Sequence, residues 1–181
     1  MYTLFAHTQF AGIGDFWNGT LHPLYTPAHL VLLIALGLCL GDQSRRRVTA
    51  AAVAFGLFSA VGTVWAIARP LTDVGQAAPL IVAMFVAVLI ALDRAIPETA
   101  LIGLFAVGGL LIGADSGVEH ATLATAMKMS LGTWLSVCFV VFNIGFYTAR
   151  LTQHWQRIGV RIAASWIVAI SMLVLAFAVR H

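Results

Sequence analysis

Apolar residues run through the chain in long blocks that short polar segments interrupt. Six such blocks stand out, at residues 27–40, 48–68, 77–92, 98–114, 122–148 and 158–179. A helix needs roughly 20 predominantly apolar residues to cross a bilayer. The pattern therefore predicts an all-α integral membrane protein with a bundle of about six transmembrane helices. The segments between the blocks are too short for another domain, so we expect one transmembrane domain over residues 21–181.

Composition supports the same setting. Of the 181 residues, 61% are hydrophobic and only 9% are charged, a balance that a soluble domain of this size cannot bury. The lipid bilayer is thus the first expected partner. A net charge of +3 in such a chain reflects membrane topology rather than nucleic-acid binding, and we expect no nucleic acid partner.

If the six predicted helices cross the membrane in alternating directions, the Lys and Arg residues fall unevenly on its two sides. Seven fall on one side: Arg45, Arg46, Arg47, Arg94, Arg150, Arg157 and Arg161. Three fall on the other: Arg69, Lys128 and Arg180. Lys and Arg concentrate in cytoplasmic loops, so the first side is predicted to be cytoplasmic, with both termini outside, in the periplasm of a Gram-negative cell.

The outer side also collects residue types that bind metals. Five of the six histidines fall there, namely His7, His22, His29, His120 and His181, and His154 falls inside. Residues 1–20 precede the first block and interleave glycines with the aromatic residues Phe5, Phe10, Phe16 and Trp17. Because aromatic rings favour the membrane interface, we expect an outward-facing interfacial segment over residues 1–20.

The first candidate site is the segment from His22 to His29. If Thr26 caps the next helix and Pro27 takes its first position, His29 lies in the first turn, where the helix dipole favours the neutral imidazole that binds metal. Residues seven apart on one continuous helix lie roughly 10 Å from each other, but Pro23 and Pro27 favour a break that brings His22 towards His29. The alternative is that both histidines lie at headgroup level and hydrogen-bond to neighbouring loops.

The second candidate site follows the block at 98–114. Asp115, Glu119 and His120 offer oxygen and nitrogen ligands that suit a divalent first-row metal, although a hydrated turn also explains them. Met127 and Met129 follow and are soft enough for Cu(I), or simply pack at a helix entrance. The predicted metal ligands are therefore His22 and His29 first, then Glu119, Asp115 and His120.

The chain resembles the HupE/UreJ family, small membrane proteins of hydrogenase and urease operons that are regarded as nickel or cobalt permeases. That family's first motif is His-Pro, four residues, then Asp-His, and its second is a glycine- and histidine-rich stretch that ends in Gly-x-Glu. The matching residues are Phe16, Gly19, His22, Pro23, Leu24, His29 and Leu30 for the first motif, and Gly113, Gly117 and Glu119 for the second. The resemblance implies six spans, a bacterial inner membrane and a nickel or cobalt substrate.

The chain departs from both motifs. Ala28 stands where the family has aspartate, and Ile112 and Ser116 stand where it has histidines. A metal site then depends on substitutes among Asp115, His120, Asp15 and His7. This pattern indicates a diverged member whose metal has changed, with copper as one option, or whose transport has been lost.

Three functional classes follow. The first is a transporter of a divalent metal, for which the membrane interior offers mainly Ser59, Thr63, Thr133, Ser136 and Asn143 as polar groups. The second is a non-transporting accessory subunit or assembly factor that joins a larger membrane metalloenzyme complex or forms a homo-oligomer. The third, an intramembrane hydrolase built on Ser116 and His120, lacks any evident orienting group. We therefore expect a protein that is not an enzyme and has no organic cofactor.

Overall fold

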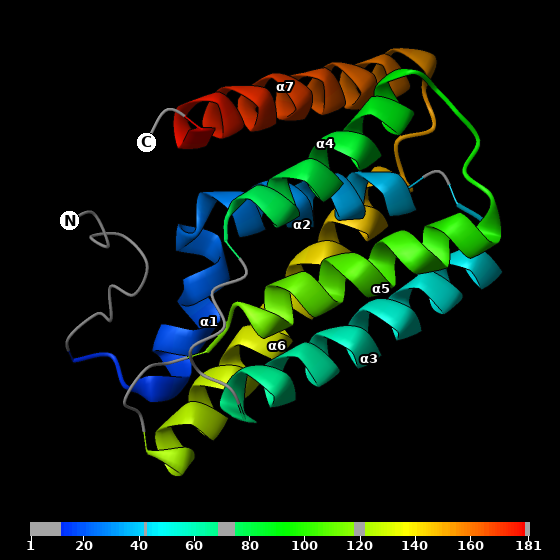
Figure 1. Cartoon of the computed structure of the whole chain (residues 1–181). Coiled ribbons are helices and arrows are strands. Elements are labelled where there is room, and N and C mark those ends of the chain that lie inside the picture. The colour runs from blue at the N-terminus through cyan, green and yellow to red at the C-terminus, as the bar shows by residue number, and fades with distance from the viewer. Residues whose placement is uncertain (1–11, 42, 69–74, 118–121, 180–181) are drawn as a thin grey trace.

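The computed structural model describes residues 12–41, 43–68, 75–117 and 122–179 (Figure 1). Within these residues the chain forms seven helices. They are α1 (Asp15–Tyr25), α2 (Pro27–Leu40), α3 (Arg45–Ala68), α4 (Ala77–Ala91), α5 (Glu98–Ala114), α6 (Leu123–Thr148) and α7 (His154–Val179). Helices α2 to α7 coincide with the six predicted blocks, which confirms the all-helical membrane fold.

Helix lengths show how the chain crosses a membrane. Helices α3, α6 and α7 are long and apolar enough to span it, and α1 with α2 forms a fourth candidate span that is bent by 75°. Helices α4 and α5 are apolar but have only 15 and 17 residues, which corresponds to about 22–26 Å. The protein is thus a multi-span helical membrane protein that also has two shorter apolar helices.

Helix α1 is an element that the sequence pattern does not predict. It begins at Asp15 and ends at Tyr25. The predicted boundary between an interfacial segment (1–20) and a transmembrane domain (21–181) falls within this helix, and that boundary stays a prediction. Two glycines let it approach α6 closely: Gly19 lies against the backbone of Met129, and Gly132 lies against the carbonyl of Phe16. Thr133 Oγ1 also donates to the Gly19 carbonyl at 2.9 Å. These contacts fix α1 beside the bundle.

Helix α2 occupies the centre of the molecule. It contacts α1, α4, α5, α6 and α7, and the side chains of Leu32, Leu33 and Leu36 are fully buried. A helix that is apolar on all sides is expected to be surrounded in this way. Its first turn, which contains His29, is therefore held in the interior of the protein.

Helices α3 and α5 pack closely through small residues. A Cβ on Gly109 would lie 2.6 Å from the Phe55 carbonyl oxygen, and one on Gly62 would lie 2.6 Å from the Leu110 carbonyl oxygen. Such close backbone approach is how helices associate in lipid, where no hydrophobic force joins them. This contact fixes the position of α5 and of the residues that follow it.

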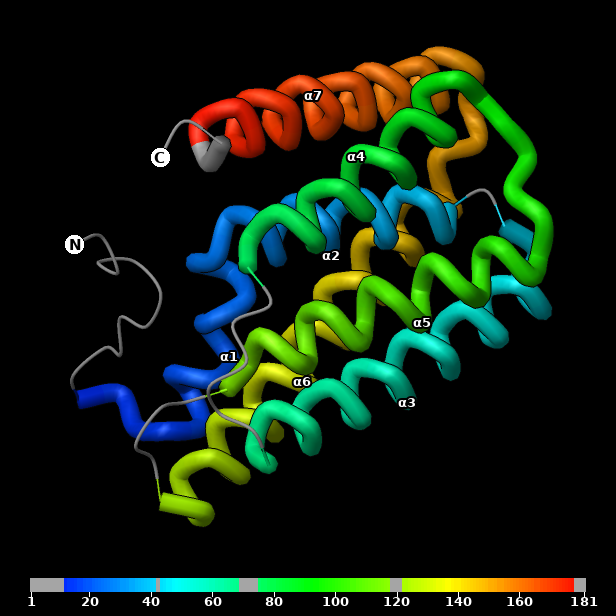
Figure 2. The backbone as a smooth tube through the Cα atoms, in the orientation of Figure 1, coloured from blue at the N-terminus to red at the C-terminus, as the bar shows by residue number. Residues whose placement is uncertain are grey.

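The helix ends divide into two groups (Figures 1 and 2). The break between α1 and α2 lies at one end of the bundle with the end of α5 and the start of α6. The start of α3, the α4–α5 link and the α6–α7 link lie at the other end. The second end holds the seven arginines that the alternation places together, and we call it the arginine-rich end.

We predict that Gly109→Ala lowers the stability of the protein by about 1–3 kcal/mol, since the added methyl group meets backbone that cannot move aside. Gly103→Ala on the same helix is the matched control, because its Cβ would meet no atom within 4 Å. It should leave stability unchanged or raise it through helix propensity. Thermal unfolding in detergent micelles measures both, and equal melting temperatures for the two variants would refute the close α3–α5 contact.

Candidate metal site at the break between α1 and α2

The break between α1 and α2 follows from two adjacent residues. Pro27 has no N–H to donate and takes the first turn of α2. A residue before proline is kept out of helical conformation, and Thr26 is extended, with φ −91° and ψ 106°. The chain therefore turns here by 75°.

Thr26 takes the N-cap position of α2 as predicted, but its hydroxyl serves the preceding helix. Thr26 Oγ1 and the Thr26 backbone N–H both donate to the His22 carbonyl, each at 3.1 Å. No side chain caps the first turn of α2. The hydrogen bonds at the break therefore belong to α1. The backbone N–H groups in the first turn of α2 have no capping side chain and can polarise a nearby group.

His29 in that first turn meets the carboxylate of Asp115. The distance from His29 Nε2 to Asp115 Oδ2 is 3.0 Å, with His29 1% exposed and Asp115 23% exposed. Asp115 stands at the end of α5, and the tight α3–α5 packing sets its place. The contact joins the two candidate sites that the sequence shows 86 positions apart.

The His29–Asp115 contact determines which imidazole nitrogen is available. A carboxylate can only accept a hydrogen bond, so Nε2 of His29 must carry the hydrogen that it donates to Asp115. In a neutral imidazole the other nitrogen, Nδ1, then has a lone pair. Nδ1 is buried and has no hydrogen-bond partner within the described residues. A histidine fixed by a carboxylate on one nitrogen, with the other free, is the usual arrangement of a metal-binding histidine.

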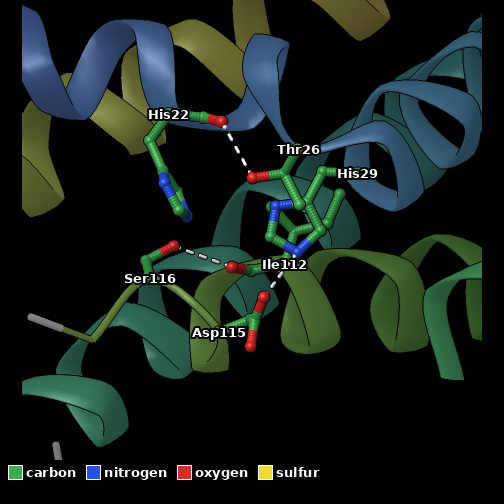
Figure 3. A network of polar contacts seen from close by, with 6 residues as sticks. All are labelled: His22, Thr26, His29, Ile112, Asp115 and Ser116. Atoms are coloured by element: carbon green, nitrogen blue, oxygen red, sulfur yellow. Dashed lines mark hydrogen bonds and ion pairs between the residues drawn. The ribbon is translucent and has the colours of Figure 1, made fainter. Parts of the chain in front are cut away.

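His22 lies beside His29, as the predicted break requires. The ring centroids are 5.8 Å apart and the rings meet edge to face at 76°. Both side chains point from the α1–α2 break towards the end of α5, where Asp115 and Ser116 lie (Figure 3). Ser116 Oγ donates to the Ile112 carbonyl at 2.7 Å, so this hydroxyl is engaged with its own helix.

The other predicted ligands stand apart from this group. Glu119, His120 and His7 lie outside the described residues. Asp15, at the start of α1, accepts a hydrogen bond from Thr125 Oγ1 at 3.2 Å, and it lies seven residues before His22, about 10 Å along the helix. In the described part of the chain, no group of three or more His, Cys, Asp or Glu residues is close enough to hold a metal.

Asp115 supplies a carboxylate near the position where the first family motif has an aspartate and this chain has Ala28. Ala28 precedes His29 where the motif has a carboxylate, and its side chain is fully buried. The carboxylate that contacts His29 comes instead from Asp115 on a separate helix. Local sequence cannot show this pairing, because it depends on how α5 packs against α2.

Three of the polar groups expected inside the membrane, Ser59, Thr63 and Asn143, are bonded to carbonyls of their own helices. Ser59 Oγ donates to the Gly56 carbonyl at 3.1 Å, and Thr63 Oγ1 donates to the Ala60 carbonyl at 2.8 Å. Asn143 Nδ2 donates to the Phe139 carbonyl at 2.8 Å. These groups satisfy their own helices in the conformation described.

Comparison with known families identifies the chain. The sequence model described as HupE / UreJ protein matches residues 1–175. The chain belongs to the HupE/UreJ family. Proteins of the HupE/UreJ family are transporter-like accessory proteins, associated with nickel or cobalt uptake for hydrogenase and urease. No curated protein and no solved structure gives a significant match.

We predict energetic coupling between His29 and Asp115 in this HupE/UreJ protein. Asp115→Ala leaves a buried imidazole N–H without its acceptor and should cost about 1–3 kcal/mol. In a His29→Ala background the same change should cost less than half as much, because no partner remains to be stranded. Melting temperatures of the two single variants and the double variant in micelles give the coupling.

A control for this cycle is Glu98→Ala. Glu98 faces Arg46 at 3.9 Å across an exposed contact, and such a pair contributes about 0–1 kcal/mol. Additive losses for His29→Ala and Asp115→Ala would contradict the pairing.

Proposed function

We propose that this HupE/UreJ protein captures a divalent ion of the nickel or cobalt type at His22 and His29 and passes it through the bundle. The observation that carries the proposal is the buried contact between His29 and Asp115, which leaves the Nδ1 lone pair of His29 beside the His22 ring. Imidazole nitrogen suits Ni²⁺ and Co²⁺.

Asp115 acts in this proposal by positioning His29 rather than by binding the ion. It fixes the imidazole tautomer and the orientation of the ring. Water completes the coordination in this proposal, and Glu119 and His120 stay predicted ligands outside the described residues. Copper binds nitrogen ligands more tightly than nickel or cobalt does, so the metal is best identified by direct comparison.

The arginine distribution supports the orientation. Because the arginine-rich end lies opposite the His22–His29 site, the positive-inside rule places that end in the cytoplasm. The metal site then faces outward, with the protein in a bacterial inner membrane. The site would then take up the ion from the outer side of the membrane, and the partly exposed carboxylate of Asp115 lies at this side.

A second candidate function is that of a non-transporting accessory subunit of a larger membrane metalloenzyme complex. The observation that favours it is the bonding of Ser59, Thr63 and Asn143 to nearby carbonyls, because a path for a divalent ion needs polar groups that can reach the ion. An accessory subunit binds metal at the outer site and gives no uptake.

We predict that His22→Ala lowers the affinity of the purified protein for Ni²⁺ or Co²⁺ at least tenfold, since it removes a ligand. Asp115→Asn should lower the affinity by about 10–100-fold, the usual effect of a lost partner behind a metal-binding histidine. Calorimetric titration in micelles with Ni²⁺, Co²⁺, Cu²⁺ and Zn²⁺ measures the affinity and selects the metal.

His154→Ala is the matched control for this titration. His154 is exposed at the start of α7, at the arginine-rich end, so its removal should leave the affinity unchanged. Gel filtration and circular dichroism establish that each variant is folded. The same affinity in wild type, His22→Ala and Asp115→Asn would exclude this site.

A further inference from the structure

A cavity of about 440 Å³ lies at the arginine-rich end, away from the metal site. Its walls come from the end of α2, the start of α3, the α4–α5 link, the end of α6 and the first turns of α7. These segments meet at one end of the bundle in Figures 1 and 2. The proposed function makes no use of this cavity.

The lining of the cavity is strongly basic. Its described residues include four arginines, Arg47, Arg94, Arg157 and Arg161, and one carboxylate, Asp93. Arg161 faces Asp93 at 3.8 Å, but both side chains are well exposed, so the pair neutralises little. The first turn of α7 also presents the positive end of a helix dipole. An anion is therefore the expected occupant.

Two arginines are held in place by the backbone. Arg47 donates to the Ile96 carbonyl, and its Nε is buried with no hydrogen-bond partner within the described residues. Arg161 Nε donates to the Ala91 carbonyl at 3.1 Å. Guanidinium groups fixed in this way match the fork geometry of phosphate oxygens.

Part of the cavity wall is apolar. Leu38, Ile90 and Ile158 line it together with the arginines. The cavity lies at helix ends, and the ends of membrane-spanning helices meet the headgroup region. Basic pockets between transmembrane helices on the cytoplasmic side bind phospholipid headgroups. A ligand with a phosphate and acyl chains satisfies both kinds of wall, whereas a free phosphate would leave the apolar wall uncovered.

We propose that this cavity binds the headgroup of an anionic phospholipid, with its phosphate held by the lining arginines Arg47, Arg94, Arg157 and Arg161. The lipid would join α7 to the rest of the bundle. Among the described side chains of α7 only Ala164, Ile167 and Ser171 are buried, and the helix packs on α4 with a smaller contact to α2. Bound lipid at its start supplies a further attachment.

Native mass spectrometry of the full chain tests the proposal. Protein in micelles is mixed with phosphatidylglycerol, with phosphatidylcholine, or with inorganic phosphate alone. We expect the wild type to retain one phosphatidylglycerol at least tenfold better than phosphatidylcholine. Arg94→Ala/Arg157→Ala should lose that preference, while retained phosphatidylglycerol should raise the wild-type melting temperature.

The charge-matched control is Arg45→Ala/Arg150→Ala, which removes two arginines from the same end outside the cavity lining and should retain the lipid as the wild type does. If the cavity variant misfolds, Arg94→Ala alone serves in its place. Equal lipid retention by the cavity variant, equal loss in the control, or stabilisation by inorganic phosphate that matches phosphatidylglycerol would each overturn the proposal.

Discussion

An imidazole buried among membrane helices has no water to bond with, and its polar atoms cost free energy unless another group satisfies them. His29 meets this constraint at Nε2 through Asp115, 3.0 Å away at the end of a different helix, and Nδ1 has no hydrogen-bond partner within the described residues. The contact requires α5 to end where α2 begins, and the close approach of α5 to α3 provides that placement. It also requires α2 to begin at Pro27, so that His29 faces inward from the first turn. The site and the bundle thus depend on each other at this point.

The two ends of the molecule carry different kinds of polar side chain. One end holds the predicted metal ligands His22 and His29 with Asp115 around the α1–α2 break, and the other holds arginines. The positive-inside rule relates this division to the two sides of the membrane, so an ion would meet histidines first. At the arginine-rich end the same charges that orient the protein also line a cavity for a phospholipid headgroup. Orientation and lipid binding therefore share one set of residues.

Much of the fold could be predicted from the sequence, because the apolar blocks mark α2 to α7 within a few residues. Pro27 marks the break that brings His22 to His29, whereas Pro23, from which a break was also expected, lies inside α1. Helix α1 was not predicted as a helix, since its contacts depend on Gly19 and Gly132 approaching another helix. The pairing of His29 with Asp115 was beyond prediction for the same reason: the residues are far apart in sequence, and only helix packing joins them. Ala28 stands where the family has an aspartate, and the carboxylate that contacts the neighbouring His29 comes instead from Asp115 on another helix.

Nickel or cobalt uptake into proteoliposomes tests the central claim most directly, with a metal indicator inside and an inside-negative potential to favour inward movement of a divalent cation. We predict uptake by the wild type and by His154→Ala, and an initial rate at least tenfold lower for His22→Ala at metal concentrations below saturation. Equal rates for wild type and His22→Ala would show that the ion does not pass through this site. Metal binding without wild-type uptake would contradict transport and favour the accessory role.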